Sequence, residues 1–220
     1  MKYIIQCCAS KDDILKNTFK YNGKIIKFVS HPKLIFMTDR NILFVRPDDL
    51  IPDTNLTWRD HLLFYNKEHH KDNPDKLKFA TDLYEPKIYS QLVNKFGWKN
   101  VYILSAGWGL IPSNFRIPGY DITYSSQAPK YAHRLHSDVF NDFNFLPSES
   151  FCFLGGKDYL PLLYNLTKNI PHESIRKIIF TKGTIDKKVE GYEYIHYETK
   201  RSTNWHYDCG KSLVLGDITI

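Results

Sequence analysis

Four short apolar runs, rich in β-branched or aromatic residues, stand out along the chain. They occupy residues 3–8, 101–104, 151–154 and 177–180, and Gly, Ser, Lys or Thr bounds each one. Continuous apolar runs of this length predict buried β-strands. Between them, apolar residues recur at helical spacing in residues 87–96, 131–143 and 159–166. Strands that alternate with helices predict an α/β fold, with a mostly parallel central sheet flanked by helices.

The region 21–77 lacks this alternation of strands and helices. It carries four prolines, the polar run 67–75, and two β-like stretches at 24–29 and 42–45. We therefore expect a single α/β domain over residues 1–220, with 21–77 as an elaboration inserted after the first βα unit. Near the C-terminus, residues 192–197 alternate weakly and predict another strand. Residues 213–220 predict either an edge strand or a tail packed on the core.

Composition narrows the class of protein. Of 220 residues, 42% are hydrophobic and 25% are charged, which matches a globular chain and excludes disorder, collagen and coiled coil. The net charge of +6 and the 15% aromatic content suit a protein that contacts phosphates and stacks on bases, although plain solubility also explains such a charge. The four cysteines lack paired spacing, and no apolar run reaches membrane-spanning length. We expect a cytoplasmic protein without membrane association, as a monomer or weak dimer.

Small residues and lysines follow each predicted strand. The segments are 8–11 (Cys-Ala-Ser-Lys), 105–109 (Ser-Ala-Gly-Trp-Gly), 155–158 (Gly-Gly-Lys-Asp) and 181–184 (Thr-Lys-Gly-Thr). Ligands of open α/β sheets bind at the carboxyl ends of strands, where small residues let backbone N–H groups approach an anion. The alternative is that these residues only form tight turns. No segment has P-loop spacing, so nucleotide hydrolysis is not indicated.

A resemblance to a known group appears in the long segment 105–124. The pattern I-L-S-A-x-x-G-L-I-P, the downstream P-x-Y-D ending at Asp121, and the preceding Asp82-Leu83-Tyr84 resemble the signature of the peroxide-stress protein YaaA and related short proteins. Those relatives also carry Cys-x-Ser-Lys and Gly-Lys-x-Tyr, as residues 8–11 and 156–159 do here. The resemblance covers residues 3–11 and about 79–167, and 21–77 has no counterpart. Gly119 interrupts the usual Pro-Tyr pair.

The resemblance implies DNA binding through a positive cleft, in an architecture similar to uracil-DNA glycosylase, without metal or cofactor. Anti-phage DNA glycosylases that remove glucosylated hydroxymethylcytosine are similar to this group. The residues expected to bind substrate are Ser10, Lys11, Ser105, Gly107, Trp108, Gly109, Asn114, Phe115, Tyr120, Gly155, Gly156, Lys157 and Trp205.

Base excision requires particular catalytic groups, and the sequence contains candidates for each of them. Cleaving an N-glycosidic bond needs a carboxylate that orients water beside an oxocarbenium-like sugar, and a donor to the leaving base. Asp121 is the favoured carboxylate and Asp158 the alternative, since Asp158 at a predicted helix start also suits a capping role. His206 or Asn204, within the mixed cluster 203–211, is the expected donor.

Aromatic and basic residues complete the expected surface. Trp108, Phe115, Tyr120 and Trp205 are candidates for stacking on a base, with core packing as the competing explanation. The cations expected to hold phosphates are Lys11, Arg116, Lys157, Lys182, Lys200, Arg201 and Lys211. The nine histidines form no metal-ligand spacing, so no zinc site is predicted.

The sequence thus predicts a DNA glycosylase that acts on a flipped, modified base, with antiviral defence as one setting. Two alternatives stay open: a non-catalytic DNA-binding stress protein, and an enzyme that binds a small nucleoside or nucleotide. A reactive thiol at Cys7 or Cys8, acidified near Lys11, is a minor alternative.

Overall fold

A seven-stranded sheet forms the centre of the molecule. The computed structural model describes residues 1–11, 17–36, 39–185 and 188–220. In sheet order the strands are β10 (Phe143–Asn144), β7 (Gly109–Pro112), β6 (Val101–Ser105), β1 (Lys2–Gln6), β11 (Phe151–Leu154), β12 (Lys177–Thr181) and β13 (Glu193–His196). The five from β6 to β13 are parallel, whereas β7 and β10 run in the opposite direction. The expected α/β fold with a mostly parallel sheet is confirmed.

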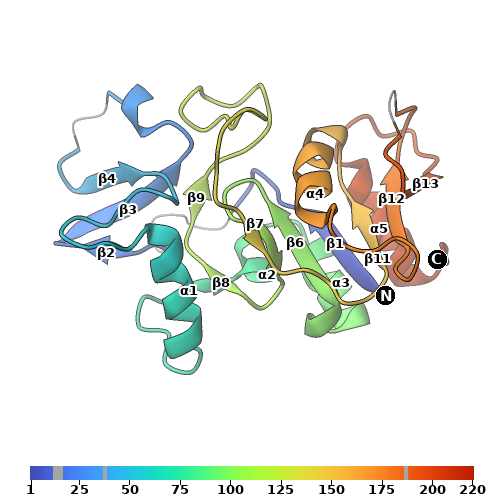
Figure 1. Cartoon of the computed structure of the whole chain (residues 1–220), viewed down its shortest axis with the longest axis horizontal. Coiled ribbons are helices and arrows are strands. Elements are labelled where there is room, and N and C mark those ends of the chain that lie inside the picture. Colours follow the sequence, from blue (N-terminus) through green and yellow to red (C-terminus); the bar gives the residue numbers. More distant parts are fainter. Residues whose placement is uncertain (12–16, 37–38, 186–187) are drawn as a thin grey trace.

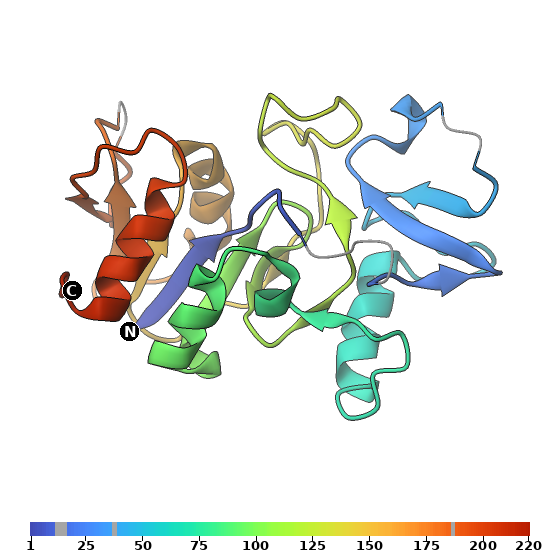
Figure 2. The same cartoon turned by 180° about the vertical axis from the view of Figure 1, so that it is seen from behind.

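Helices cover both faces of this sheet. Helices α3 (Ile88–Phe96) and α5 (Trp205–Leu215) lie side by side on one face, and α4 (Leu160–Thr167) lies on the other (Figures 1 and 2). Helix α3 buries Ile88, Leu92 and Val93 along one stripe and ends at Gly97, whose positive φ of 84° suits a residue without a side chain. The short elements nearby are α2 (Ala80–Leu83), η2 (Trp98–Asn100) and η3 (Lys157–Tyr159).

A second, smaller sheet is built mainly by the predicted insertion. Strand β3 (Lys24–Val29) pairs with β4 (Ile42–Val45), with β2 (Lys20–Tyr21) near its start, and with β9 (Tyr120–Asp121) near its end. The two β-like stretches of the sequence are therefore strands, as predicted. The short helix η1 (Pro32–Leu34) follows β3. Strand β5 (Lys78–Phe79) pairs with β8 (Arg116–Ile117) in a separate two-stranded sheet.

Helix α1 (Trp58–Glu68) packs against this small sheet. Its start is fixed by a capping box, in which Thr57 and Asp60 each accept a backbone N–H of the other. Trp58 and Tyr65 are buried and contact the ring of Phe19. The sequence pattern did not predict this helix, because the prolines and the polar run of region 21–77 indicated an irregular elaboration instead.

One expectation about local structure is wrong, and one pair of alternatives is decided. Residues 131–142 form an irregular loop instead of a helix. Of the apolar face expected there, Leu135 is 47% and Val139 83% exposed, whereas Phe143 is buried in β10. At the C-terminus, α5 continues to Leu215, so no edge strand forms. The alternative of a packed tail holds, because Ile218 and Ile220 contact the core. The strand expected at 192–197 is present as β13.

The loop 131–142 is held by a buried ion pair. Arg134 is 3% exposed and donates two hydrogen bonds to the carboxylate of Asp142, at 2.8 and 2.7 Å. It also donates to the carbonyl of Ala106 at 2.6 Å, directly after β6. The arginine thus replaces a helical face as the anchor of this segment, because one buried guanidinium satisfies both the loop and the sheet.

We predict that Arg134→Ala destabilises the protein by about 3–5 kcal/mol, since it leaves the Asp142 carboxylate buried without its partner. Urea unfolding at neutral pH measures this change. The matched control is Arg176→Ala, which breaks the exposed pair with Glu193 and is expected to change stability little. A similar small effect for both variants would contradict the anchoring role of Arg134.

Candidate functional site

The topology places a crevice at the carboxyl end of β1. Strand β1 lies between β6 and β11 in the sheet. The chain passes first from β1 to β6 on one side, and later returns to form β11 on the other side. In open α/β sheets such a switch point opens a crevice beyond the strand ends, which is where ligands bind. A pocket of about 290 Å³ lies there. The residues that line it are Gln6, Cys7, Cys8, Ala9, Ser10, Thr123, Ser125, Gly156, Asp158, Tyr159, Asn204 and Tyr207.

Hydrogen bonds tie the walls of this pocket together. The side-chain oxygen of Gln6 accepts the N–H of Gly156 at 2.6 Å, which joins the end of β1 to the loop after β11. The buried Cys7 thiol lies 3.2 Å from the hydroxyl of Tyr159 and accepts the N–H of Ala106 at 3.3 Å. The half-buried Cys8 thiol accepts the N–H of Ser10 at 3.2 Å. Both thiols are therefore engaged, and the described pocket lining contains no histidine to activate them.

Two phenols provide neutral donors in the pocket. Burial raises the pKa of Tyr159 well above its usual value, with the neighbouring Cys7 adding to the shift. Burial likewise raises the pKa of Tyr207, helped by its hydrogen bond with Cys8. Both hydroxyls therefore stay protonated at neutral pH and can donate hydrogen bonds to a ligand.

Asp158 is the only carboxylate among the described residues that line the pocket. It lies in η3, exposed, and neither η3 nor α4 has a side-chain capping bond. No hydrogen bond or ion pair joins Asp158 to the described part of the chain, so the capping explanation for this residue does not apply. Asp121, the favoured candidate, instead lies in β9 opposite Val29, beside Lys11 and the phenol of Tyr131. It does not line the pocket.

Helix α5 brings one predicted donor to the pocket and buries the other. Asn204 precedes the helix with a positive φ of 54°, makes no side-chain cap, and lines the pocket. His206 is 3% exposed, and its Nε2 has no hydrogen-bond partner among the described residues. Because His206 lies inside the helix packing rather than in the pocket, it is not positioned to contact a leaving base. The structure thus separates the two donors that the sequence analysis grouped.

The turn after β6 is structural instead of anion-binding. The Ser105 hydroxyl oxygen accepts the N–H groups of Gly107 and Trp108, while Cys7 uses that of Ala106. Its carbonyls are also occupied, because Arg134 binds Ala106 and the buried Arg59 binds the next two residues. These donors point into the protein, so the expectation that this turn cradles a phosphate is wrong.

The aromatic residues of this segment belong to the core. Trp108 and Tyr120 are fully buried. Trp108 packs on Phe28 and Phe143, and the Tyr120 hydroxyl bonds those of Ser105 and Tyr84 at 2.9 and 2.8 Å. Neither ring is free to stack on a base, which corrects that expectation.

Because of the hairpin between β6 and β7, two further residues expected to bind substrate lie far from the pocket. Gly109 makes the turn with a φ of 80°, and a Cβ there would lie 2.5 Å from the carbonyl oxygen of Phe143. Strand β7 then runs back, so Asn114 and Phe115 lie near the start of β6, where the N–H of Ser113 bonds Val101. The expected ligand contacts of Asn114 and Phe115 are therefore wrong. Their neighbour Arg116 bonds the carbonyl of Leu77 and covers the ring of Phe79.

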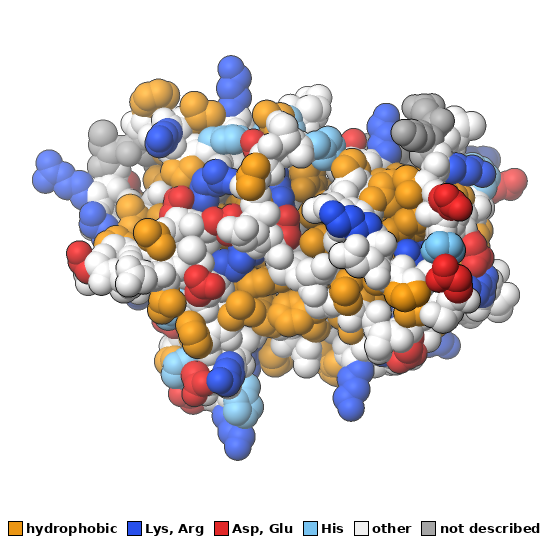
Figure 3. Space-filling view, in the orientation of Figure 1, with side chains coloured by type: hydrophobic (Ala, Val, Ile, Leu, Met, Phe, Trp, Pro, Cys, Tyr) orange, Lys and Arg blue, Asp and Glu red, His pale blue; other side chains and the backbone are white. Residues whose placement is uncertain are grey.

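The predicted phosphate-binding cations fall into several environments. Lys157 and Lys182 line a second cavity, of about 350 Å³, beside the first. Arg201 and Lys211 face Asp208 at 2.8 and 3.9 Å. Lys200 is exposed, and the Lys11 ammonium lies 4.3 Å from the centre of the Tyr120 ring, where burial lowers its pKa. On the face shown in Figure 3, Lys and Arg side chains are dispersed instead of gathered in one patch.

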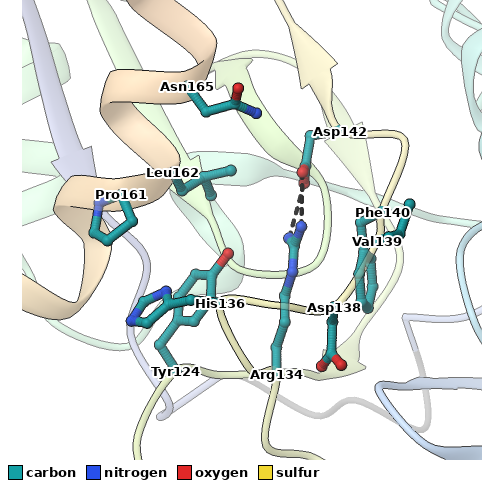
Figure 4. A pocket seen from close by; sticks show the side chains of 10 residues that line it. All are labelled: Tyr124, Arg134, His136, Asp138, Val139, Phe140, Asp142, Pro161, Leu162 and Asn165. Carbon is teal, nitrogen blue, oxygen red and sulfur yellow. Dashed lines mark hydrogen bonds and ion pairs between the residues drawn. The ribbon is translucent and has the colours of Figure 1, made fainter.

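A third cavity, of about 270 Å³, lies between α4 and the loop 131–142 (Figure 4). Its charged groups are already matched within the protein: Arg134 binds Asp142, and Asp138 accepts the N–H of Leu135 and faces His31. Tyr124 and His136 stack at its edge. We assign this cavity to the anchoring of the loop.

Sequence reasoning missed several residues of the pocket. Thr123 and Ser125 line it from the segment after β9, while the intervening Tyr124 faces the third cavity. This alternation is the signal of an extended segment with two faces. Gln6 was also missed as a pocket residue, because a polar residue at a strand end gives no sign of what it faces. Tyr207 lay within the cluster 203–211 but was given no role.

Comparisons with protein-family models, with curated proteins and with solved structures found no match. Across the described residues, no helix combines the length and apolarity that crossing a membrane requires. In the same part of the chain, no three His, Cys, Asp or Glu side chains group closely enough to share a metal ion.

Burial lowers the pKa of His206 to about 4, which makes stability depend on pH. The unfolded chain binds a proton near pH 6.5 and the folded protein does not, so stability is lost as pH falls from about 6.5 to 4. We expect His206→Leu to remove roughly 1–3 kcal/mol of this pH dependence, measured as the difference between urea unfolding at pH 7 and pH 4.5. Identical pH profiles for both proteins would show that His206 is not buried as a neutral ring.

Proposed function

We propose that the protein is a DNA glycosylase that hydrolyses the N-glycosidic bond of a base held in the β1–β11 pocket. The observation that carries this proposal is the composition of that pocket: one uncommitted carboxylate, Asp158, among neutral donors. The volume, about 290 Å³, is at the small end for ligand sites and suits one base with its sugar. Enzymes that act on a base in DNA extrude it into such a pocket.

Asp158 supplies the negative charge that the reaction needs. As the C1′–N bond breaks, positive charge develops on the sugar, and a nearby carboxylate stabilises it and orients the attacking water. The water oxygen forms the new bond to C1′, one water proton passes to the carboxylate, and the base leaves with the bonding electrons. Because Asp158 has no hydrogen bond to the described chain, it is available for both tasks.

The leaving base needs donors as its negative charge grows. The Asn204 amide and the Tyr207 hydroxyl lie in the same pocket, and the raised pKa of Tyr207 keeps its proton in place. Donors that are fixed before the reaction stabilise a developing anion without reorganisation. The hydroxyls of Ser10, Thr123 and Ser125, which also line the pocket, would read the edge of the base.

Relatedness to the YaaA group and a uracil-DNA-glycosylase-like architecture form part of the proposal. The parallel sheet with its crevice at β1 supports it, as do pocket contacts from both Cys-x-Ser-Lys and Gly-Lys-x-Tyr. A hydrolase of free nucleosides is the second candidate, because the pocket has the size of a single nucleoside. The non-catalytic DNA-binding alternative gives no role to the uncommitted Asp158 in the pocket, so the pocket composition supports it less.

We expect Asp158→Asn to slow excision about 100-fold or more, since a positioned carboxylate contributes roughly 10²–10⁴ to rate. The assay uses DNA with cytosine, uracil, hydroxymethylcytosine or glucosylated hydroxymethylcytosine, followed by alkali to break abasic sites. Asp121→Asn is the matched control and is expected to retain activity. Loss of activity in Asp121→Asn alone would overturn the assignment of Asp158.

We expect Tyr207→Phe to lower the single-turnover rate about 10- to 100-fold, because it removes one donor to the leaving base. Tyr197→Phe, whose hydroxyl lies 3.2 Å from Ser212 outside the pocket, is the control and should leave the rate unchanged. An unaffected rate in Tyr207→Phe would exclude this phenol from the reaction.

A further inference from the structure

A second cavity opens directly beside the candidate pocket. It lies at the carboxyl ends of β11 and β12 and has a volume of about 350 Å³. Gly156 and Asp158 line both cavities, so they form the wall between them. A ligand that fills the first pocket therefore has a neighbouring site within reach.

The two cavities differ in chemistry. The first is lined by polar groups, whereas the second has an apolar lining of Leu160, Phe180, Ile185 and Trp205. Trp205 is 8% exposed and stacks with Tyr197, so the position of its ring in the cavity lining is fixed. A fixed aromatic side chain in an apolar slot suits a flat ring better than a sugar.

Two lysines flank this apolar slot. Lys157 comes from the loop after β11 and Lys182 from the loop after β12, and both line the cavity. Within the described chain, neither lysine makes a hydrogen bond or an ion pair, in contrast to Arg201 and Lys211 nearby. Asp158 is the only acidic residue among the described lining residues, and it lies on the wall shared with the first pocket. Unmatched ammonium groups beside an apolar slot indicate a ligand with a ring and an anionic group.

We propose that this second cavity binds the nucleotide next to the excised one on the same DNA strand. Its base lies against Trp205 and Leu160, and its phosphate lies between Lys157 and Lys182. This inference rests on the proposed function, since it assigns the first pocket to the extruded base. It makes the minimal ligand a dinucleotide, and it gives the enzyme a preference for its neighbouring base through stacking.

The test measures equilibrium binding of the full-length protein to a short single-stranded oligodeoxynucleotide, by fluorescence anisotropy over a range of salt concentrations. In two further oligonucleotides, an abasic tetrahydrofuran replaces the nucleotide on the 5′ or the 3′ side of a central cytosine. We expect one of these replacements to weaken binding about 10-fold, because it removes one stacked base. Lys182→Ala is expected to weaken binding to every sequence and to reduce the salt slope by about one.

The matched control is Lys95→Ala. Lys95 is exposed at the end of α3, close in sequence to the start of β6, and thus at the opposite edge of the sheet. The Lys95→Ala variant should leave the affinity for each oligonucleotide and the salt slope unchanged. Because Lys182 is only half-buried and makes no hydrogen bond or ion pair within the described chain, its Ala variant is expected to fold. The oligonucleotide series tests the slot without any change in the protein.

The outcomes separate this inference from the proposed function. A neighbour-dependent affinity without any base excision would support the second cavity and reject the glycosylase. Excision that is indifferent to both neighbouring nucleotides and to Lys182→Ala would overturn the second cavity alone. Absence of binding to all three oligonucleotides would also overturn it.

Discussion

The structure depends on the hydrogen bonding of one buried turn, Ser105 to Trp108. The Cys7 thiol, directly after β1, accepts a hydrogen bond from this turn. Arg59 of the insertion and Arg134 of the loop 131–142 donate hydrogen bonds to its carbonyls. The Ser105 hydroxyl donates a hydrogen bond to the Tyr120 hydroxyl of β9. Each of these groups would be costly to bury unpaired, so satisfying the turn requires all four segments to be in place together.

This constraint explains why the candidate site lies beside the turn and not on it. The backbone donors after β6 are consumed within the protein, whereas the loops after β1 and β11 keep side chains open to a pocket. Cys7 belongs to both regions: it fixes the turn on one side and contacts Tyr159 on the other. The rigid turn thus supports one wall of the pocket, while Asp158 and Asn204 remain available for chemistry.

Much of the fold was predictable because its strands are locally encoded. The four apolar runs, the helices at 87–96 and 159–166, and the two stretches of the insertion all carry their pattern within a few residues. The helix expected at 131–143 is absent because Leu135 and Val139 match helical spacing, but an ion pair within the segment, Arg134 with Asp142, holds it as a loop. Spacing along the chain does not reveal such a pair.

The candidate site was only partly predictable, for a similar reason. From the rule that ligands bind at strand ends, Ser10, Gly156 and Asp158 were expected to lie together, and all three line one pocket. The rule could not show that Gly109 turns the chain back into β7, which sends Asn114 and Phe115 to the opposite edge. Nor could it separate Asn204 from His206, because the register of α5 determines which side chain faces the pocket.

The most direct test of this account is to measure, by mass spectrometry, what the wild-type protein releases from DNA that carries modified cytosines and, separately, from the matching free nucleosides. The account predicts release of a free base from DNA, with one abasic site formed for each base released. Release from nucleosides alone, or no release from either substrate, would contradict the assignment of the β1–β11 pocket to an extruded DNA base.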